Sequence, residues 1–172
     1  RHPHVFGTAK AGTSEEVLRQ WQEIKEKVEG RAKKDSVLDE VPKSLPPLER
    51  AYKMQKKAAK VGFDWKAAPD VWDKIREELS ESERACEEAS RGGDQAALEG
   101  EIGDLLFSVL NVSRFLGVNP SLALQRTNEK FSRRFRYVEK RMAEEGAAMG
   151  KENFARMDAL WDEAKVKLGT DS

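Results

Sequence analysis

Apolar residues recur every three or four positions along most of the chain, in segments that end at glycine or proline. Such a repeat places apolar side chains on one face of an α-helix. The first segment starts at Thr13-Ser14-Glu15-Glu16, a capping box in which Thr13 can accept from the first free amides and Glu16 can reach back. The pattern predicts a helix from Thr13 to the residue before Gly30.

Two further helices are predicted before residue 91. Residues 31–47 contain three prolines and little periodicity, so we expect a linker there. A helix follows from about Leu48 to Val61. The next helix runs from near Pro69 to about Ser90, and its apolar side is formed by Val71, Trp72, Ile75, Leu79 and Cys86.

Three more helices are predicted after a short break at Arg91-Gly92-Gly93. Asp94 is a suitable N-cap for a fourth helix that ends at Gly117. Asn119-Pro120 combines an N-cap with proline at the first helical position and starts a fifth, which fades before Gly146. The last apolar repeat lies between Phe154 and Leu168. Because no strand-like alternation is present in the sequence, the predicted fold is all-α.

Two acidic residues interrupt the apolar pattern of the fourth predicted helix. Glu101 falls within the apolar stripe, and Asp104 lies on its edge. A carboxylate that faces a core without a partner costs several kcal/mol, so a cation is the expected compensation. The stripe is made by Leu98, Leu105, Val109, Val112 and Leu116.

A second acidic pair, Glu78 and Glu81, lies at the edge of the third helix, whereas Glu77 points further outward. The short break at residues 91–93 forces the third and fourth helices to run antiparallel, which can bring this pair level with Glu101 and Asp104. Four carboxylates between two helices indicate Mg²⁺ or Mn²⁺, because zinc prefers His or Cys. Acidic pairs at this spacing are usually a solvated face. The position of Glu101 inside an apolar stripe favours the metal site.

The fifth helix carries basic residues beside its apolar stripe. Lys130 and Arg134 are four residues apart, and Asn128 lies near them. Basic side chains beside a metal can bind a polyphosphate, because they neutralise phosphate charge that the metal does not reach. Arginine can in addition hold two phosphate oxygens at once. We expect Arg133 and Arg136 to pair with the acidic surface instead.

Composition excludes several classes of protein. The 31 basic and 31 acidic residues give a net charge of zero, so no global field attracts nucleic acid or an anionic membrane. The single cysteine, Cys86, excludes an intramolecular disulfide framework and fits a reducing, cytoplasmic compartment. The only sizeable apolar run, Leu105 to Leu110, is far shorter than the ~20 residues of a membrane span.

One loop and three motifs stand in a characteristic order along the chain. The loop is Gly62-Phe63-Asp64-Trp65, ahead of the third helix. The motifs are Glu77-Glu78-Leu79-Ser80-Glu81, Glu101-Ile102-Gly103-Asp104-Leu105-Leu106-Phe107 and Asn128-Glu129-Lys130-Phe131-Ser132-Arg133-Arg134-Phe135. With these motifs, about residues 41–168 resemble the MazG family of nucleoside triphosphate pyrophosphohydrolases.

The resemblance implies an all-helical fold assembled as a dimer. It also implies an enzyme that cleaves nucleoside triphosphates to a nucleoside monophosphate and pyrophosphate. Such an enzyme could remove non-canonical or excess nucleotides. A catalytic domain over residues 48–172 would follow an N-terminal extension over 1–47. The start of the chain resembles the end of a preceding domain in longer, tandem relatives, so we expect a C-terminal domain. Mg²⁺ or Mn²⁺ would be bound by Glu78, Glu81, Glu101 and Asp104, with Glu78 or Glu81 acting on the attacking water. Substrate would be contacted by Lys74, Asn128, Lys130, Arg134 and Trp161.

Other functions stay open at this point. A non-catalytic helical dimerisation or partner-binding module has the same amphipathic helices. A relative specialised for dUTP, dCTP or phosphoribosyl-ATP would share the acidic pairs. Ala97 stands where some relatives carry a basic residue, which removes one expected phosphate contact.

Overall fold

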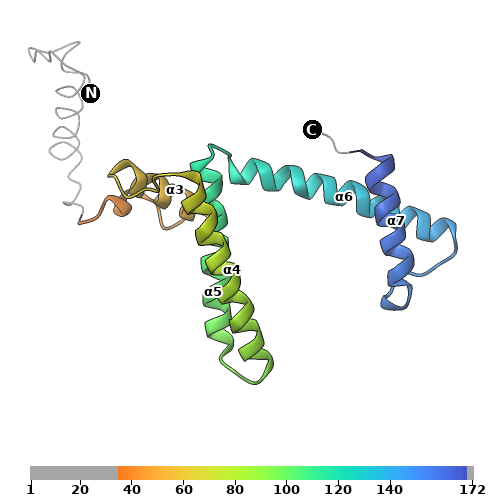
Figure 1. The fold of residues 1–172 in the computed structure, drawn as a ribbon. Coiled ribbons are helices and arrows are strands. Elements are labelled where there is room, and N and C mark those ends of the chain that lie inside the picture. Colours follow the sequence, from red (N-terminus) through yellow and green to blue (C-terminus); the bar gives the residue numbers. More distant parts are fainter. Residues whose placement is uncertain (1–34, 170–172) are drawn as a thin grey trace, which may run out of the picture. The chain divides into compact units, whose positions relative to one another are not determined.

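The computed structural model describes residues 35–169 as helices joined by short turns, with no strand in that range (Figure 1). The all-α prediction is confirmed. The helix predicted from Thr13 lies outside the described residues. The helices are η1 (Val37–Glu40), α3 (Pro47–Lys60), α4 (Ala68–Ser90), α5 (Gln95–Phe115), α6 (Pro120–Glu144), η2 (Lys151–Asn153) and α7 (Phe154–Lys167).

The chain divides into two compact units, Arg1–Asp64 and Trp65–Ser172. The described part of the first unit holds η1 and α3, which pack on each other, and the second holds α4 to α7. The short helix η1 lies inside the predicted linker and begins with a capping box at Ser36. Apolar periodicity does not detect a helix of a single turn. The boundary expected at residue 47 stays a prediction.

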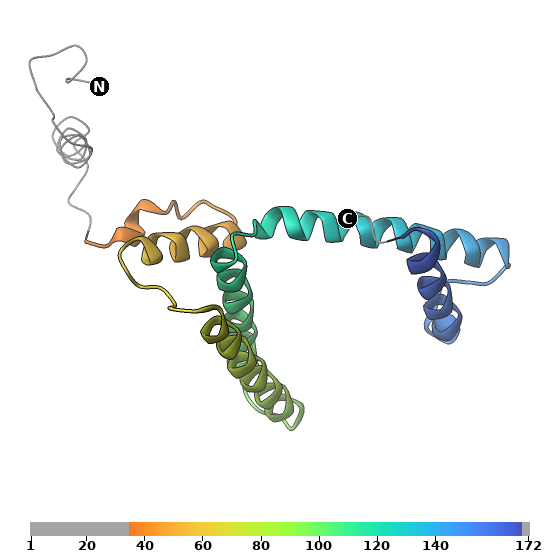
Figure 2. The same cartoon turned by 45° about the horizontal axis from the view of Figure 1, so that its top comes forward.

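Helices α4 and α5 form an antiparallel hairpin, as the glycine break predicts (Figure 2). Gly92 has a φ of +90°, a conformation that other residues rarely adopt. A Cβ atom on Gly93 would lie 2.7 Å from the carbonyl oxygen of Glu88, so this turn also needs glycine for close approach. The carboxylate of Asp94 then accepts from the amide of Ala96 at 2.9 Å, which confirms the predicted N-cap.

Only part of the apolar side of α4 that the sequence predicts is buried. Val71 is buried and Ile75 is half-buried, whereas Trp72 and Leu79 are 44% and 46% exposed. Glu78 and Ser82 are buried as well, so a charged and a small polar side chain lie on the buried face of α4. The larger apolar side chains Trp72 and Leu79 face outward.

Helices α6 and α7 pack on a small apolar core. Asn119 accepts from the amide of Leu122 at 3.2 Å and Pro120 is the first residue of α6, so the predicted start is confirmed. Val138, Met142 and Leu160 are almost completely buried and form the centre of this core. The partly buried residues around it are Ala147, Met157 and Trp161.

A polar network joins α6 to α7 beside this core. The carboxylate of Glu163 accepts from the hydroxyl of Tyr137 at 2.6 Å and from Arg141 at 2.8 Å, and it pairs with Lys167 at 2.5 Å. The hydrogen bonds from Lys167 and Tyr137, with the charge of Arg141, lower the pKa of Glu163 from 4.5 to about 2. Glu163 therefore stabilises the packing of α6 on α7 in its charged form.

We predict that Glu163→Gln lowers the melting temperature near pH 7 but has little effect at low pH. Because the folded-state pKa of Glu163 is below its ordinary value of 4.5, its contribution is present above that value and is lost as pH falls towards 2. Thermal unfolding between pH 7 and pH 3 measures the difference. Glu139→Gln, at an exposed position on α6, is the matched control. A destabilisation by Glu163→Gln that does not shrink with falling pH would contradict this account.

Candidate metal site

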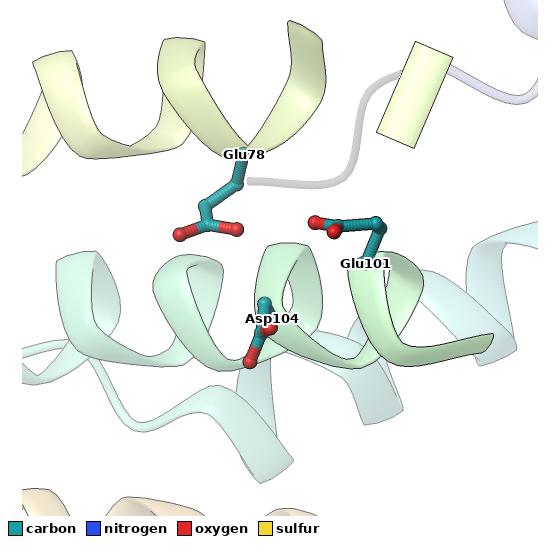
Figure 3. Close-up of side chains that lie close together, drawn as sticks. All are labelled: Glu78, Glu101 and Asp104. Carbon is teal, nitrogen blue, oxygen red and sulfur yellow. The ribbon is translucent and has the colours of Figure 1, made fainter. Parts of the chain in front are cut away.

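Three carboxylates from two helices converge between α4 and α5 (Figure 3). Glu78 extends from α4 towards Glu101 and Asp104 on α5, and one oxygen from each residue lies within 4.8 Å of the other two. Glu78 is buried, Glu101 is half-buried and Asp104 is exposed. The group is therefore open to solvent on the side of Asp104 and enclosed on the side of Glu78.

The local sequence explains how these side chains meet. Glu101 and Asp104 are three residues apart and so lie on neighbouring positions of one helical face. On α4, the buried hydroxyl of Ser82 is directed at two backbone carbonyls, that of Glu78 at 2.8 Å and that of Glu101 at 3.2 Å. Contact of Ser82 with the α5 backbone at Glu101 fixes the register of the antiparallel pair, so Glu78, one turn before Ser82, lies opposite Asp104 and within reach of Glu101.

A cation already contacts this group. The ammonium of Lys74 lies 2.7 Å from Oε1 of Glu78 and 3.0 Å from Oε1 of Glu77. Hydrogen bonds to Glu78 and then to Glu77 raise the pKa of Lys74 above its ordinary value of 10.5. Lys74 therefore stays protonated in the neutral range and offsets part of the negative charge of the three carboxylates.

The donor set fits a hard divalent cation. Mg²⁺ and Mn²⁺ bind carboxylate oxygens, whereas structural zinc sites are built from Cys and His. Mg²⁺ held by a few carboxylates keeps coordination positions for water or substrate phosphates. Three converging carboxylate oxygens and an exposed side can therefore hold such an ion while leaving it accessible.

Glu81 lies outside the group of three carboxylates. Its side chain is half-buried and pairs with Arg84 at 3.5 Å, one turn further along α4. A role for Glu81 in metal binding or catalysis stays a prediction. Glu77 is mostly exposed, with a side chain 57% accessible, in agreement with its predicted outward direction.

The predicted substrate residues lie on α6 and α7, apart from Lys74. Asn128 is exposed on α6, and Lys130 on the same helix is half-buried. Arg134 donates to the carbonyl of Gly169 at 3.5 Å. Trp161 on α7 packs against the core, as its place on an apolar stripe indicates, and its ring lies 5.1 Å from that of Phe131. Neither α6 nor α7 carries any of the three clustered carboxylates.

Two contributors to the site do not follow from the acidic motifs. The ion pair of Lys74 with Glu78 has a sequence signal, because a basic and an acidic residue four positions apart are neighbours on a helix. Ser82 has no such signal, since a serine inside an acidic helix gives no indication that it faces the partner helix.

Residues 70–138, which include all three clustered carboxylates, match the MazG nucleotide pyrophosphohydrolase domain. Residues 70–138 form a MazG domain. Over 165 residues the chain is 45% identical to the nucleoside triphosphate pyrophosphohydrolase of Escherichia coli K12. It is 39% identical to the nucleoside triphosphate pyrophosphohydrolase/pyrophosphatase MazG of Thermotoga maritima, and 46% identical to the uncharacterized protein YabN of Bacillus subtilis.

Each alignment covers 96% of this MazG chain. The chain spans 62% of the E. coli relative, 60% of the T. maritima relative and 33% of YabN. The family predicted from the acidic and basic motifs is confirmed. Within residues 35–169, no helix is both long enough and apolar enough to cross a membrane.

Mg²⁺ or Mn²⁺ is expected to raise the melting temperature of this MazG domain. A ligand at 100 times its dissociation constant stabilises by about 2.7 kcal/mol, or roughly 5–10 °C for a chain of this size. Asp104→Asn should abolish most of the rise, because it removes one of the three charged donors. Glu99→Gln, an exposed position on the same helix, should retain it. Equal metal-dependent shifts in both variants would exclude the assigned ligands.

Proposed function

We propose that this MazG domain hydrolyses nucleoside triphosphates to nucleoside monophosphates and pyrophosphate with Mg²⁺, and that Mn²⁺ can replace it. The convergence of Glu78, Glu101 and Asp104 carries the proposal, because three clustered carboxylates are costly unless a cation uses them. The names of the E. coli and T. maritima relatives support the reaction.

Different carboxylates have different roles in the proposed reaction. Glu78, Glu101 and Asp104 hold the ion, which when bound lowers the pKa of a coordinated water and neutralises phosphate oxygens. Glu81 follows Glu78 by one turn on α4, and we propose that its carboxylate orients the attacking water or accepts its proton. Glu78 is an alternative base if only one of its oxygens contacts the ion.

The substrate requires cations and an aromatic surface in addition to the metal. Lys130 and Arg134 supply charge for the phosphates, and the guanidinium of Arg134 can hold two phosphate oxygens. Asn128, two residues before Lys130 on α6, is exposed. Trp161 is half-buried beside Phe131 and offers a ring edge to the nucleotide.

We also propose that the domain functions as a homodimer. Apolar side chains on the outer face of α5 are exposed, Ile102 by 44%, Leu106 by 62% and Val109 by 45%. Trp72 and Leu79 of α4 are exposed as well. Extensive apolar exposure of this kind marks an interaction surface. A second copy of the chain is the partner that the family resemblance implies.

Substrate profiling tests the reaction and separates it from its rivals. Nucleoside and deoxynucleoside triphosphates should release pyrophosphate rather than orthophosphate, and only when Mg²⁺ or Mn²⁺ is present. Asp104→Asn and Glu101→Ala should reduce the rate by at least about 100-fold, since the metal supplies several kcal/mol of charge stabilisation. Circular dichroism checks that the variants are folded, and Glu99→Gln is the active control.

Full pyrophosphate release by a folded Asp104→Asn or Glu101→Ala variant would refute the assigned site. Failure to release pyrophosphate from any nucleotide, in a chain that binds no metal, would favour a non-catalytic helical module. Activity restricted to dUTP, dCTP or phosphoribosyl-ATP would identify a specialised relative.

Leu106→Glu is expected to weaken self-association. A charge at the centre of an apolar interface leaves a carboxylate without water or a partner. Sedimentation velocity at micromolar concentration should show the wild-type chain as a dimer and the variant shifted towards monomer. Val166→Glu is the control, because Val166 is an 85% exposed apolar residue on α7, away from the α5 face. A monomeric wild-type chain would contradict the proposed assembly.

A further inference from the structure

Glu78 has two competing uses in this structure. Its carboxylate belongs to the group of three that can hold a divalent ion, and the same carboxylate pairs with the ammonium of Lys74 at 2.7 Å. Only 7% of the Glu78 side chain is accessible, so water contributes little to neutralising it. The partner of Glu78 therefore determines how its buried charge is compensated.

Lys74 is suited to leave Glu78 when another cation arrives. Its side chain is 36% accessible, and its ammonium also contacts Oε1 of Glu77 at 3.0 Å. Glu77 is a more exposed acidic partner that can retain the ammonium after Glu78 is taken. Lysine also has a flexible stem and a compact charge, unlike the planar, bidentate guanidinium of arginine.

We propose that Lys74 is the counter-ion of Glu78 in the metal-free site. Lys74 gives up Glu78 when a metal binds, and this competition limits the affinity of the site for the metal. The inference rests on the proposed metal-dependent function. Without metal, Lys74 reduces the repulsion among Glu78, Glu101 and Asp104. When metal binds, the ion takes the place of the ammonium at Glu78 and then experiences its positive charge nearby.

The test is direct titration of Mg²⁺ and of Mn²⁺ into the metal-free chain by isothermal titration calorimetry. Lys74→Met should bind either ion on the order of tenfold more tightly than the wild-type chain, because it removes a competing positive charge at contact distance from a ligand. Its metal-free melting temperature should fall, since Glu78 loses its partner. Its metal-induced rise in melting temperature should be larger than that of the wild type.

Two further variants separate charge from packing. Lys74→Arg keeps the positive charge and should keep the metal affinity near that of the wild type. Arg76 lies on the same helix and pairs with exposed Asp73. Arg76→Met therefore removes a cation away from the site and should leave metal affinity unchanged. A loss of helix stability alone would affect melting temperature without tightening metal binding.

The outcomes distinguish this inference from the proposed function. Equal or weaker metal binding by a folded Lys74→Met variant overturns the counter-ion role, while metal binding by the wild-type chain leaves the metal site intact. If the wild-type chain binds neither Mg²⁺ nor Mn²⁺, the metal-dependent function itself fails.

Discussion

Repulsion among three carboxylates held between two packed helices is the constraint on which the rest of the structure depends. Glu78 is buried against α5, where it meets Glu101 and Asp104. Such an arrangement costs free energy unless cations compensate it. The chain supplies one cation through Lys74, and the three converging carboxylate oxygens can bind another. If the site binds a metal as we propose, it does so at the expense of the stability of the metal-free hairpin.

The same constraint affects how α4 and α5 pack. Burying Glu78 and Ser82 places a polar and small-residue face between the helices, so the larger apolar side chains Trp72, Leu79 and Leu106 point outward. The hairpin therefore buries little apolar surface of its own. A second copy that covers the outer face would supply the missing hydrophobic stabilisation. Metal binding and assembly would then be linked, because the polar face of the hairpin turns inward to the metal site and the apolar face turns outward to a second copy.

Helices α6 and α7 are held together by different interactions from those between α4 and α5. Their contact is an apolar core around Met142 and Leu160, with the network of Glu163, Tyr137 and Arg141 beside it. This pair is held together by its own side chains and needs no ion. It therefore offers a fixed support for Lys130 and Arg134, the residues that we propose contact the phosphates.

Local signals in the sequence determined the helix starts at Asp94 and Asn119-Pro120, the glycine turn, and the identity of the acidic pairs, because caps and turns depend on a few adjacent residues. Tertiary structure decided which face of α4 is buried. Periodicity identifies an apolar side of a helix but not its rotation against a partner, and that rotation depends on how closely two backbones can approach. The burial of Glu78 and the contact of Ser82 with the backbone of α5 follow from that approach. The sequence therefore contained the acidic residues, and only the packing of α4 on α5 decided which of them meet.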